Sequence, residues 1–236
     1  PEGQMGNSEV GHMNLGAGRI VYQDLAKINL AIAENTLKDE VVLKDAMAYA
    51  KANDKTIHLL GLLSNGGVHS HVNHVKSLLN ILSQNKCAKV ALHGFTDGRD
   101  VDPHSGAGFV ADLEAHMAKT TGKIGSLIGR YFAMDRDQRW DRVQKAYALL
   151  VNGEGAATSD FVAALETSYQ NGVTDEFIEP LINNDGDTKI EEGDVVLFFN
   201  FRTDRGRELT QMLSQKAFPE QGTTPLDLHY VTLTNY

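Results

Sequence analysis

The sequence contains little of what stabilises small secreted domains or anchors membrane proteins. Its single cysteine, Cys87, excludes an internal disulfide and offers no metal cluster of its own. No uninterrupted apolar run approaches the roughly 20 residues that cross a bilayer, and the glycine-rich, polar residues 1–18 lack a signal-peptide pattern. Basic residues number 22 against 31 acidic ones, and this net charge of −9 argues against a duplex nucleic-acid binder, which normally has a basic face. We therefore expect a cytoplasmic protein that binds neither membranes nor nucleic acid.

What the 236 residues do contain is an ordinary globular composition, with 42% hydrophobic and 22% charged residues. We expect strands at 56–63, 89–94, 123–129, 194–201 and 228–233, and a short one at 177–182. We expect helices at 72–82, 106–119, 140–150, 158–170 and 204–215, and two more between 22 and 52. Thr36 should cap the second of these two, and Thr158 or Ser159 the helix at 158–170. This order predicts βαβ units, and so an α/β fold with a mostly parallel sheet flanked by helices.

Arginines, but not lysines, gather in the segments that follow four of the predicted strands. Five of the nine arginines and none of the 13 lysines lie there, namely Arg99, Arg130, Arg136, Arg202 and Arg205. Ligands bind outside the carboxyl ends of parallel strands, and a guanidinium makes two-point contacts with phosphate or carboxylate. The placement predicts an anion pocket, although any one arginine is as compatible with capping a helix or pairing with a nearby aspartate. Arg202 and Arg205 would share a helical face if the helix begins near Thr203.

Two further side chains at the predicted strand ends are candidates for acid–base chemistry. His69 follows Gly66-Gly67, which lets the backbone approach a ligand, and an imidazole there suits proton transfer near neutral pH. His71 and His74 invite a metal site with His69, but their spacing does not converge on one helix face, so we expect structural or solvated roles. Asp100 follows Arg99 directly; it can serve as an acid–base group, as an acceptor for a substrate hydroxyl, or equally as a turn or helix cap.

Ser8 lies between glycines in Gly6-Asn7-Ser8-Glu9-Val10-Gly11-His12. The segment does not match the G-x-S-x-G elbow of hydrolases. A serine can act as a nucleophile when a base or a metal activates it, and a plain loop is equally compatible with this pattern. The chain starts in this loop-like stretch and ends in a strand-like run, so we expect a piece of a longer protein.

Five motifs together resemble the cofactor-independent (2,3-bisphosphoglycerate-independent) phosphoglycerate mutase family. They are GNSEVGH at 6–12, GLLSNGGVHSH at 61–71, HGFTDGRDVDP at 93–103, GRYFAMDRDQRWDRV at 129–143 and FFNFRTDRGREL at 198–209, in family order. The resemblance implies an isomerase that interconverts 3-phosphoglycerate and 2-phosphoglycerate in glycolysis and gluconeogenesis. It further implies a monomer in which an alkaline-phosphatase-superfamily domain binds two divalent metal ions, typically Mn²⁺, and an inserted α/β domain binds the substrate.

The resemblance also assigns roles by motif. Ser8 is implied to be the nucleophile that becomes phosphoserine, and a metal ligand. His69 and Asp100 are implied to handle protons and contact glycerate. The five arginines, Arg99, Arg130, Arg136, Arg202 and Arg205, are implied to hold the phosphate and carboxylate of the substrate.

The same resemblance divides the chain. Residues 1–20 would be the nucleophile loop, a remnant of the metal domain, and 21–236 the inserted substrate-binding domain with an incomplete C-terminus; residues 19–23 would form a hinge. The other metal ligands would lie before Pro1 and after Tyr236, so we expect this chain alone to be inactive. Two alternatives stay open: a phosphatase-type metal hydrolase of the same superfamily, and a phosphoglycerate-binding module without catalysis.

Overall fold

The computed structural model describes residues 15–16, 23–184 and 187–236 of the chain. Ser8, the rest of the nucleophile loop predicted at 1–20, and most of the hinge predicted at 19–23 lie outside the described residues. Within the described part, no helix is both long and apolar enough to cross a membrane.

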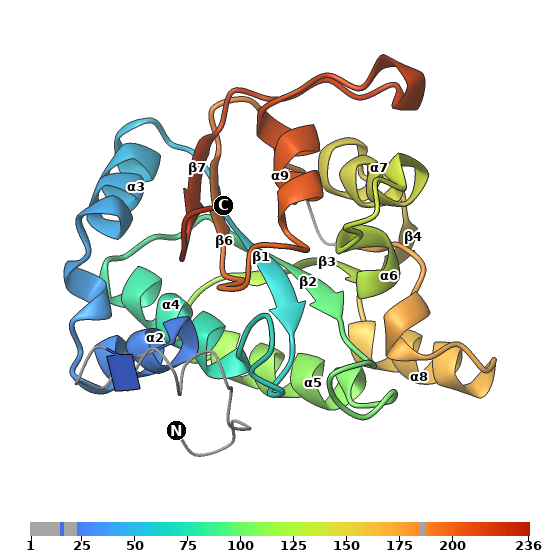
Figure 1. The fold of residues 1–236 in the computed structure, drawn as a ribbon, viewed down its shortest axis with the longest axis horizontal. Helices are drawn as coiled ribbons and strands as arrows, with labels where there is room; N and C mark the ends of the chain where they lie inside the picture. The colour runs from blue at the N-terminus through green and yellow to red at the C-terminus, as the bar shows by residue number, and fades with distance from the viewer. Residues whose placement is uncertain (1–14, 17–22, 185–186) are drawn as a thin grey trace.

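A seven-stranded sheet forms the centre of the described chain, in the order β4-β5-β3-β2-β1-β6-β7 (Figure 1). The strands are β1 (Ile57–Leu63), β2 (Val90–Thr96), β3 (Lys123–Gly129), β4 (Ala156–Thr158), β5 (Leu181–Asn183), β6 (Val195–Phe198) and β7 (His229–Thr232). The run from β3 through β2, β1 and β6 to β7 is parallel throughout. Only β5 pairs antiparallel, against β3. The prediction of a mostly parallel α/β sheet is confirmed.

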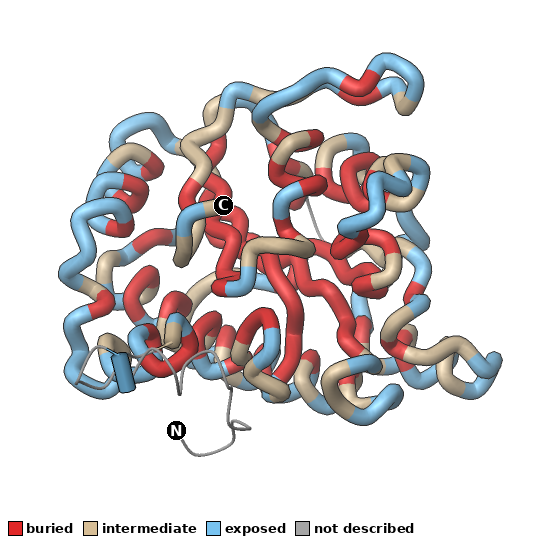
Figure 2. The backbone as a smooth tube through the Cα atoms, viewed as in Figure 1, coloured by how far each residue is buried: buried red, intermediate tan, exposed pale blue. Residues whose placement is uncertain are grey.

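Helices cover both faces of the sheet, as the ribbon and the buried interior show (Figures 1 and 2). The helices are α2 (Asp24–Ala33), α3 (Val41–Ala52), α4 (Val72–Gln84), α5 (Gly106–Met117), α6 (Arg130–Ala133), α7 (Trp140–Tyr147), α8 (Phe161–Gln170) and α9 (Arg207–Ser214). Side chains of α3, α4, α5 and α8 join one core, and those of α6, α7 and α9 join the other. Along β1, Leu59 and Leu63 enter the first core, while Leu60 and Leu62 enter the second. Successive side chains of β1 point to opposite faces of the sheet, and both faces are covered by helices. Nearly all residues of the strand are therefore hydrophobic.

Two predicted helix caps are wrong. Asp160, not Thr158 or Ser159, caps α8, because its carboxylate accepts the N–H of Ala163 at 2.9 Å. Thr158 belongs to β4, a strand that the sequence patterns did not indicate. The Thr36 hydroxyl donates to the Ala31 carbonyl at 3.3 Å; it makes no capping hydrogen bond to the 3₁₀ turn that follows at Leu37–Asp39, and α3 begins only at Val41.

Helix α9 begins at Arg207, three residues later than the predicted start at 204. Arg202 and Arg205 therefore lie in the connection between β6 and α9 and do not share a helical face. The predicted strand at 177–182 is also displaced, because a 3₁₀ turn occupies Asp175–Phe177 and β5 covers Leu181–Asn183.

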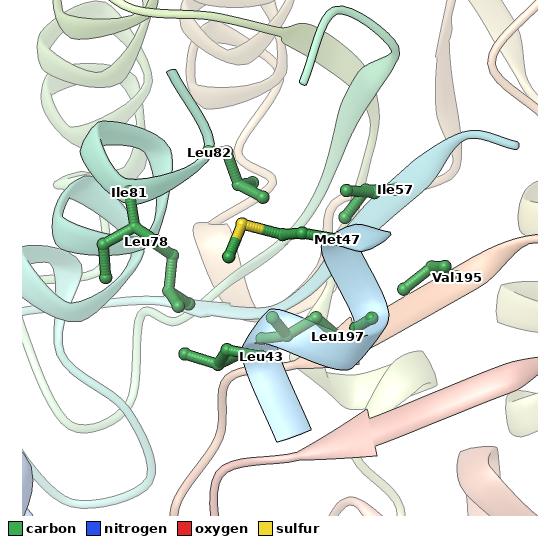
Figure 3. Close-up of a pocket in the computed structure, with 9 residues that line it drawn as sticks. Leu43, Met47, Ile57, Leu78, Ile81, Leu82, Val195 and Leu197 are labelled. Atoms are coloured by element: carbon green, nitrogen blue, oxygen red, sulfur yellow. The ribbon is translucent and has the colours of Figure 1, made fainter. Parts of the chain in front are cut away.

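The interior between α3, α4 and the strands β1 and β6 contains a small apolar cavity (Figure 3). Its lining includes Leu43, Met47, Leu78, Leu82 and Val195. The volume of the cavity is about 10 Å³. Its walls are almost entirely apolar, so a water molecule inside would have no hydrogen-bond partners. It is a packing imperfection of the core and is far too small for a substrate.

A line of buried polar side chains crosses the sheet from β6 to β3. His58 Nε2 lies 3.1 Å from the Asp194 carboxylate, which also accepts the N–H groups of Thr56 and Glu191. His58 Nδ1 lies 2.9 Å from His93 Nε2, and His93 Nδ1 lies 2.7 Å from the Ser126 hydroxyl. These contacts are satisfied when the Ser126 hydroxyl donates to His93, His93 donates to His58, and His58 donates to Asp194.

Candidate active site

The segments that follow β1, β2, β3 and β6 meet at one edge of the sheet. Because these four strands are neighbours and run parallel, their carboxyl ends lie together. Backbone hydrogen bonds join the segments after β1 and β6: the His69 carbonyl accepts the N–H of Phe201 at 2.8 Å and that of Arg202 at 3.3 Å. The topology thus brings together residues that are far apart in sequence.

Arg130 is the buried centre of this edge. Only 3% of the residue is exposed, and its Nη1 lies 2.5 Å from Asp97 and 2.6 Å from Asp100. Burial would lower the pKa of Arg130, but these two carboxylates hold it above its usual value. Asp97 also accepts the N–H groups of Arg99 and Asp100, at 3.2 and 3.1 Å. One buried carboxylate therefore organises the turn after β2 and orients Arg130 at the same time.

His69 lies between two carboxylates and is 3% exposed. Its Nε2 is 3.9 Å from Asp100, and its Nδ1 is 3.7 Å from Asp204. Burial, followed by the positive charge of Arg130, lowers the pKa of His69 to about 4, against the opposing influence of both carboxylates. The imidazole is therefore neutral at neutral pH, and among the described residues its buried Nδ1 has no hydrogen-bond partner. A neutral ring in this position can accept a proton from a ligand.

The remaining arginines surround this centre. Asp204 lies between two of them, 3.0 Å from Arg136 and 3.0 Å from Arg202. Arg205 donates to the Met134 carbonyl at 3.0 Å. Burial lowers the pKa of Arg205 from its usual value, and the nearby positive charges of Arg136, Arg130 and Arg99 lower it further. These charges act on one another because the guanidinium groups converge, and such a group of like charges favours a bound anion.

Arg99 forms the exposed rim of the site. Its side chain is 57% exposed, and its Nη1 lies 3.5 Å from the Glu176 carboxylate. The turn before it depends on Gly98, which has φ +64° and whose missing Cβ would lie 2.8 Å from the backbone nitrogen of Glu176. The glycine lets the 3₁₀ turn at 175–177 approach the site.

The structure brings together His69, Asp100 and all five arginines that the sequence indicated. The alternative that single arginines pair with a nearby carboxylate is also supported. The arginines that do so are Arg99, Arg130, Arg136 and Arg202. Asp100 is neither a turn nor a helix cap: it pairs with Arg130 and lies beside His69.

Sequence reasoning missed two aspartates that organise the site, Asp97 and Asp204. The side chain of Asp97 is 1% exposed, accepts backbone N–H groups of the turn after β2 and pairs with Arg130. Their position inside the arginine-bearing segments was the available signal. His71 and His74 have structural partners: the His71 ring accepts the N–H of Asn73 at the start of α4, and the His74 ring bonds Asn29.

We expect the ring of His69 to titrate near pH 4 in the folded protein, against an ordinary value of 6.5. Between these values the unfolded chain binds more protons, so the contribution of His69 to stability falls as pH drops from 6.5 towards 4 and is constant above 6.5. Nuclear magnetic resonance of the histidine rings measures the midpoint, with His69→Gln to assign the signal. A midpoint at the ordinary value would show that the ring is solvated.

Comparison with known proteins identifies the family. A family model described as the BPG-independent PGAM N-terminus matches residues 28–236. The chain belongs to the BPG-independent phosphoglycerate mutase family. This confirms the resemblance carried by the five motifs.

Relatives in this family resemble the chain along its whole length. It is 60% identical over 240 residues to the 2,3-bisphosphoglycerate-independent phosphoglycerate mutase of Flavobacterium psychrophilum, covering 100% of this chain and 48% of that protein. The enzyme of the same name from Bacteroides thetaiotaomicron is 53% identical over 237 residues, covering 100% of this chain and 47% of that protein. A crystal structure of Leishmania mexicana phosphoglycerate mutase at low cobalt concentration superimposes with a TM-score of 0.86 at 33% identity, covering 98% of this chain and 45% of that one. The chain thus spans about half the length of the curated relatives it matches.

Proposed function

We propose that the full-length protein interconverts 3-phosphoglycerate and 2-phosphoglycerate, and that this chain supplies its substrate-binding domain and nucleophile loop. In this proposal residues 21–236 bind the substrate and residues 1–20 belong to the metal domain. The observation that carries the proposal is the convergence of five arginines, His69 and Asp100 on one sheet edge of a chain from this family.

The charge of the substrate matches this edge. Phosphoglycerate carries a phosphate and a carboxylate, and both are recognised by guanidinium groups in two-point contacts. Arg136 and Arg202 already hold a carboxylate, that of Asp204, so the same donors suit a substrate anion. Arg130 is committed to Asp97 and Asp100 through Nη1, and we assign its remaining N–H groups to the substrate.

The proposed reaction moves a phosphoryl group twice. The Ser8 hydroxyl gives up its proton as its oxygen forms a bond to phosphorus, the bond from phosphorus to the glycerate oxygen breaks, and that oxygen takes up a proton. The glycerate then presents its other hydroxyl, which gives up its proton and forms a bond to phosphorus, while the bond from phosphorus to the Ser8 oxygen breaks and Ser8 takes up a proton. The neutral His69 ring and Asp100, 3.9 Å apart, are the groups of this chain that we assign to carrying these protons and holding the glycerate hydroxyls. Arginines stabilise charge on the transferring oxygens.

The family implies two divalent metal ions, and we keep Mn²⁺ as the expected species. The described residues do not form such a centre: they contain no group of three or more His, Cys, Asp or Glu side chains able to hold a metal ion. Ser8, the one metal ligand predicted on this chain, lies outside them.

The proposal is tested with the full-length protein, 3-phosphoglycerate and Mn²⁺, without added bisphosphoglycerate. We expect 2-phosphoglycerate as the product. Release of inorganic phosphate instead would favour the phosphatase-type hydrolase. Calorimetric titration of this chain with 3-phosphoglycerate addresses the binding-module alternative, because a module must bind without the other domain.

Removing Arg205 is expected to weaken substrate binding by about 2 kcal/mol, roughly 30-fold, since it would remove a charge-assisted contact to a partly desolvated anion. The measurement is the dissociation constant of 3-phosphoglycerate for Arg205→Ala, and Arg202→Ala should behave alike. Arg207→Ala, which removes an exposed arginine of α9, is the control. If Arg205→Ala binds 3-phosphoglycerate as tightly as wild type, Arg205 has a structural role and does not bind the substrate.

A further inference from the structure

The pairing of β1 with β6 ends before β1 itself does. The last pair in their register is Leu60 with Phe198, and the N–H of Phe199 still donates to the Leu60 carbonyl at 2.9 Å. Strand β1 continues to Leu63, where it is still paired with β2. The peptide groups of β1 that face β6 beyond Leu60 need other hydrogen-bond partners, because buried backbone groups are almost always paired.

Two buried side chains supply these partners at Leu62. The N–H of Leu62 donates to the side-chain oxygen of Asn200 at 2.9 Å, and the carbonyl of Leu62 accepts the Ser70 hydroxyl at 2.5 Å. Asn200 and Ser70 are both 0% exposed, so water does not compete for these hydrogen bonds. The two side chains take the place of the next backbone hydrogen bonds between the strands, and this lets the backbones of β1 and β6 separate.

Backbone groups of the candidate active site lie directly beside this substitution. The His69 carbonyl accepts the N–H groups of Phe201 at 2.8 Å and of Arg202 at 3.3 Å. Ser70 follows His69 in the sequence, and Asn200 precedes Phe201. A shift of either buried side chain would therefore move one partner of the backbone hydrogen bonds that join His69 to Arg202.

Asn200 also contacts two further segments. Its side-chain nitrogen lies 3.9 Å from the Met134 sulfur, a weak acceptor, and the Met134 carbonyl accepts a hydrogen bond from Arg205. The backbone carbonyl of Asn200 accepts the hydroxyl of Tyr236 at 2.8 Å. One fully buried residue thus connects the end of β1 with the segments that follow β3, β6 and β7.

We propose that Asn200 and Ser70 are positioning residues, whose side chains replace the backbone pairing of β1 with β6 at Leu62 and so fix His69 against Arg202. Alanine at either position would leave a buried peptide group of Leu62 without its partner, and a shift of the two segments is the way to avoid that cost. The effect on substrate rests on the proposed function, but the placement of His69 does not.

The kinetic test compares full-length Asn200→Ala and Ser70→Ala with wild type in the turnover of 3-phosphoglycerate. We expect kcat/KM per folded molecule to fall about tenfold in each, because displacing a catalytic group by about 1 Å can cost roughly 100-fold. Ser70→Ala removes only one oxygen atom, so it tests the proposal even if Asn200→Ala does not fold. Asn80→Ala, which removes an exposed asparagine of α4, is the matched control.

A second control separates positioning from lost stability. Asp194 is also buried, but it lies at the opposite, amino ends of the same strands, where it accepts the N–H of Thr56. Asp194→Ala should therefore destabilise the fold without lowering kcat/KM per folded molecule. A structural role alone for Asn200 and Ser70 would give the same result as Asp194→Ala.

The His69 ring gives a measurement that needs no substrate. Burial and then the charge of Arg130 hold its pKa at about 4; Arg202 also lowers it, whereas Asp100 and Asp204 raise it. Nuclear magnetic resonance should show a midpoint closer to 6.5 in Asn200→Ala and Ser70→Ala, because a displaced ring gains water, and an unchanged midpoint in Asp194→Ala.

A wild-type kcat/KM or a wild-type midpoint in either folded variant would overturn the proposal. Equal changes in Asp194→Ala would overturn it as well, since they would follow from lost stability. If wild type itself does not turn over 3-phosphoglycerate, the proposed function fails, and the His69 midpoints still decide whether the two side chains position that ring.

Discussion

Replacing Arg130 with alanine is expected to lower the free energy of unfolding by about 3–5 kcal/mol, the usual cost of breaking a buried ion pair from one side. The guanidinium lies within 2.6 Å of both Asp97 and Asp100, and its side chain is 2% exposed. Without it, the buried carboxylate of Asp97 and the partly buried one of Asp100 lose their shared cation, and among the described residues Asp97 keeps only backbone donors. We also expect loss of measurable substrate affinity, because Asp100 and the turn after β2 lose their anchor.

Urea denaturation measures this prediction, with substrate titration on the same protein. Arg130→Lys separates charge from geometry: it keeps the positive charge on a single ammonium group but lacks the other guanidinium N–H groups, so an intermediate loss is expected. Arg207→Ala removes an exposed arginine close to Arg205 in the sequence and is the control. Its free energy of unfolding should stay within about 0.5 kcal/mol of wild type. A loss for Arg130→Ala as small as that control would contradict the central role of this ion pair.

Replacing Asp194 with alanine is expected to lower the free energy of unfolding by about 3 kcal/mol, because it leaves the buried His58 ring and two partly buried backbone N–H groups without their acceptor. The carboxylate receives hydrogen bonds from Thr56, Glu191 and the His58 ring, and the line of polar side chains through His93 depends on this one acceptor. The site at the opposite, carboxyl ends of the strands does not contain Asp194, so substrate affinity should change much less than stability.

The pH dependence of the free energy of unfolding provides a second measurement of the role of Asp194. Burial alone would raise the pKa of Asp194, but hydrogen bonds from His58 and the backbone outweigh it and hold the pKa below its usual value of 3.8. A lowered carboxyl pKa contributes stability above the unfolded value, and that contribution is lost as pH falls from 3.8 through the folded value. Asp194→Ala should lack this acid-labile contribution, whereas Asp227→Ala, an exposed neighbour, should retain it. Equal acid profiles in Asp194→Ala and wild type would contradict the prediction.

Much of the architecture could be predicted because it depends on local pattern. Mostly apolar runs such as the one ending at Leu63 alternate with helical stripes, and short βαβ connections leave few ways to order the strands. The arginine edge followed from that order alone, since carboxyl ends of parallel strands share one side of the sheet. Element boundaries were less predictable: α9 starts at Arg207 because the preceding residues are held by contacts to distant segments, such as Arg205 to Met134.

The sequence by itself determined the α/β class, the mostly parallel sheet, the family, and the convergence of His69, Asp100 and five arginines on one edge. These depend on period, spacing and motif, which are linear properties of a chain. Only the tertiary structure decided which acid meets which base: that Asp97 holds Arg130, and that Asp204 holds Arg136 and Arg202. Such pairs join residues up to about 70 positions apart, and their energies depend on burial and distance, which exist only once the chain has folded.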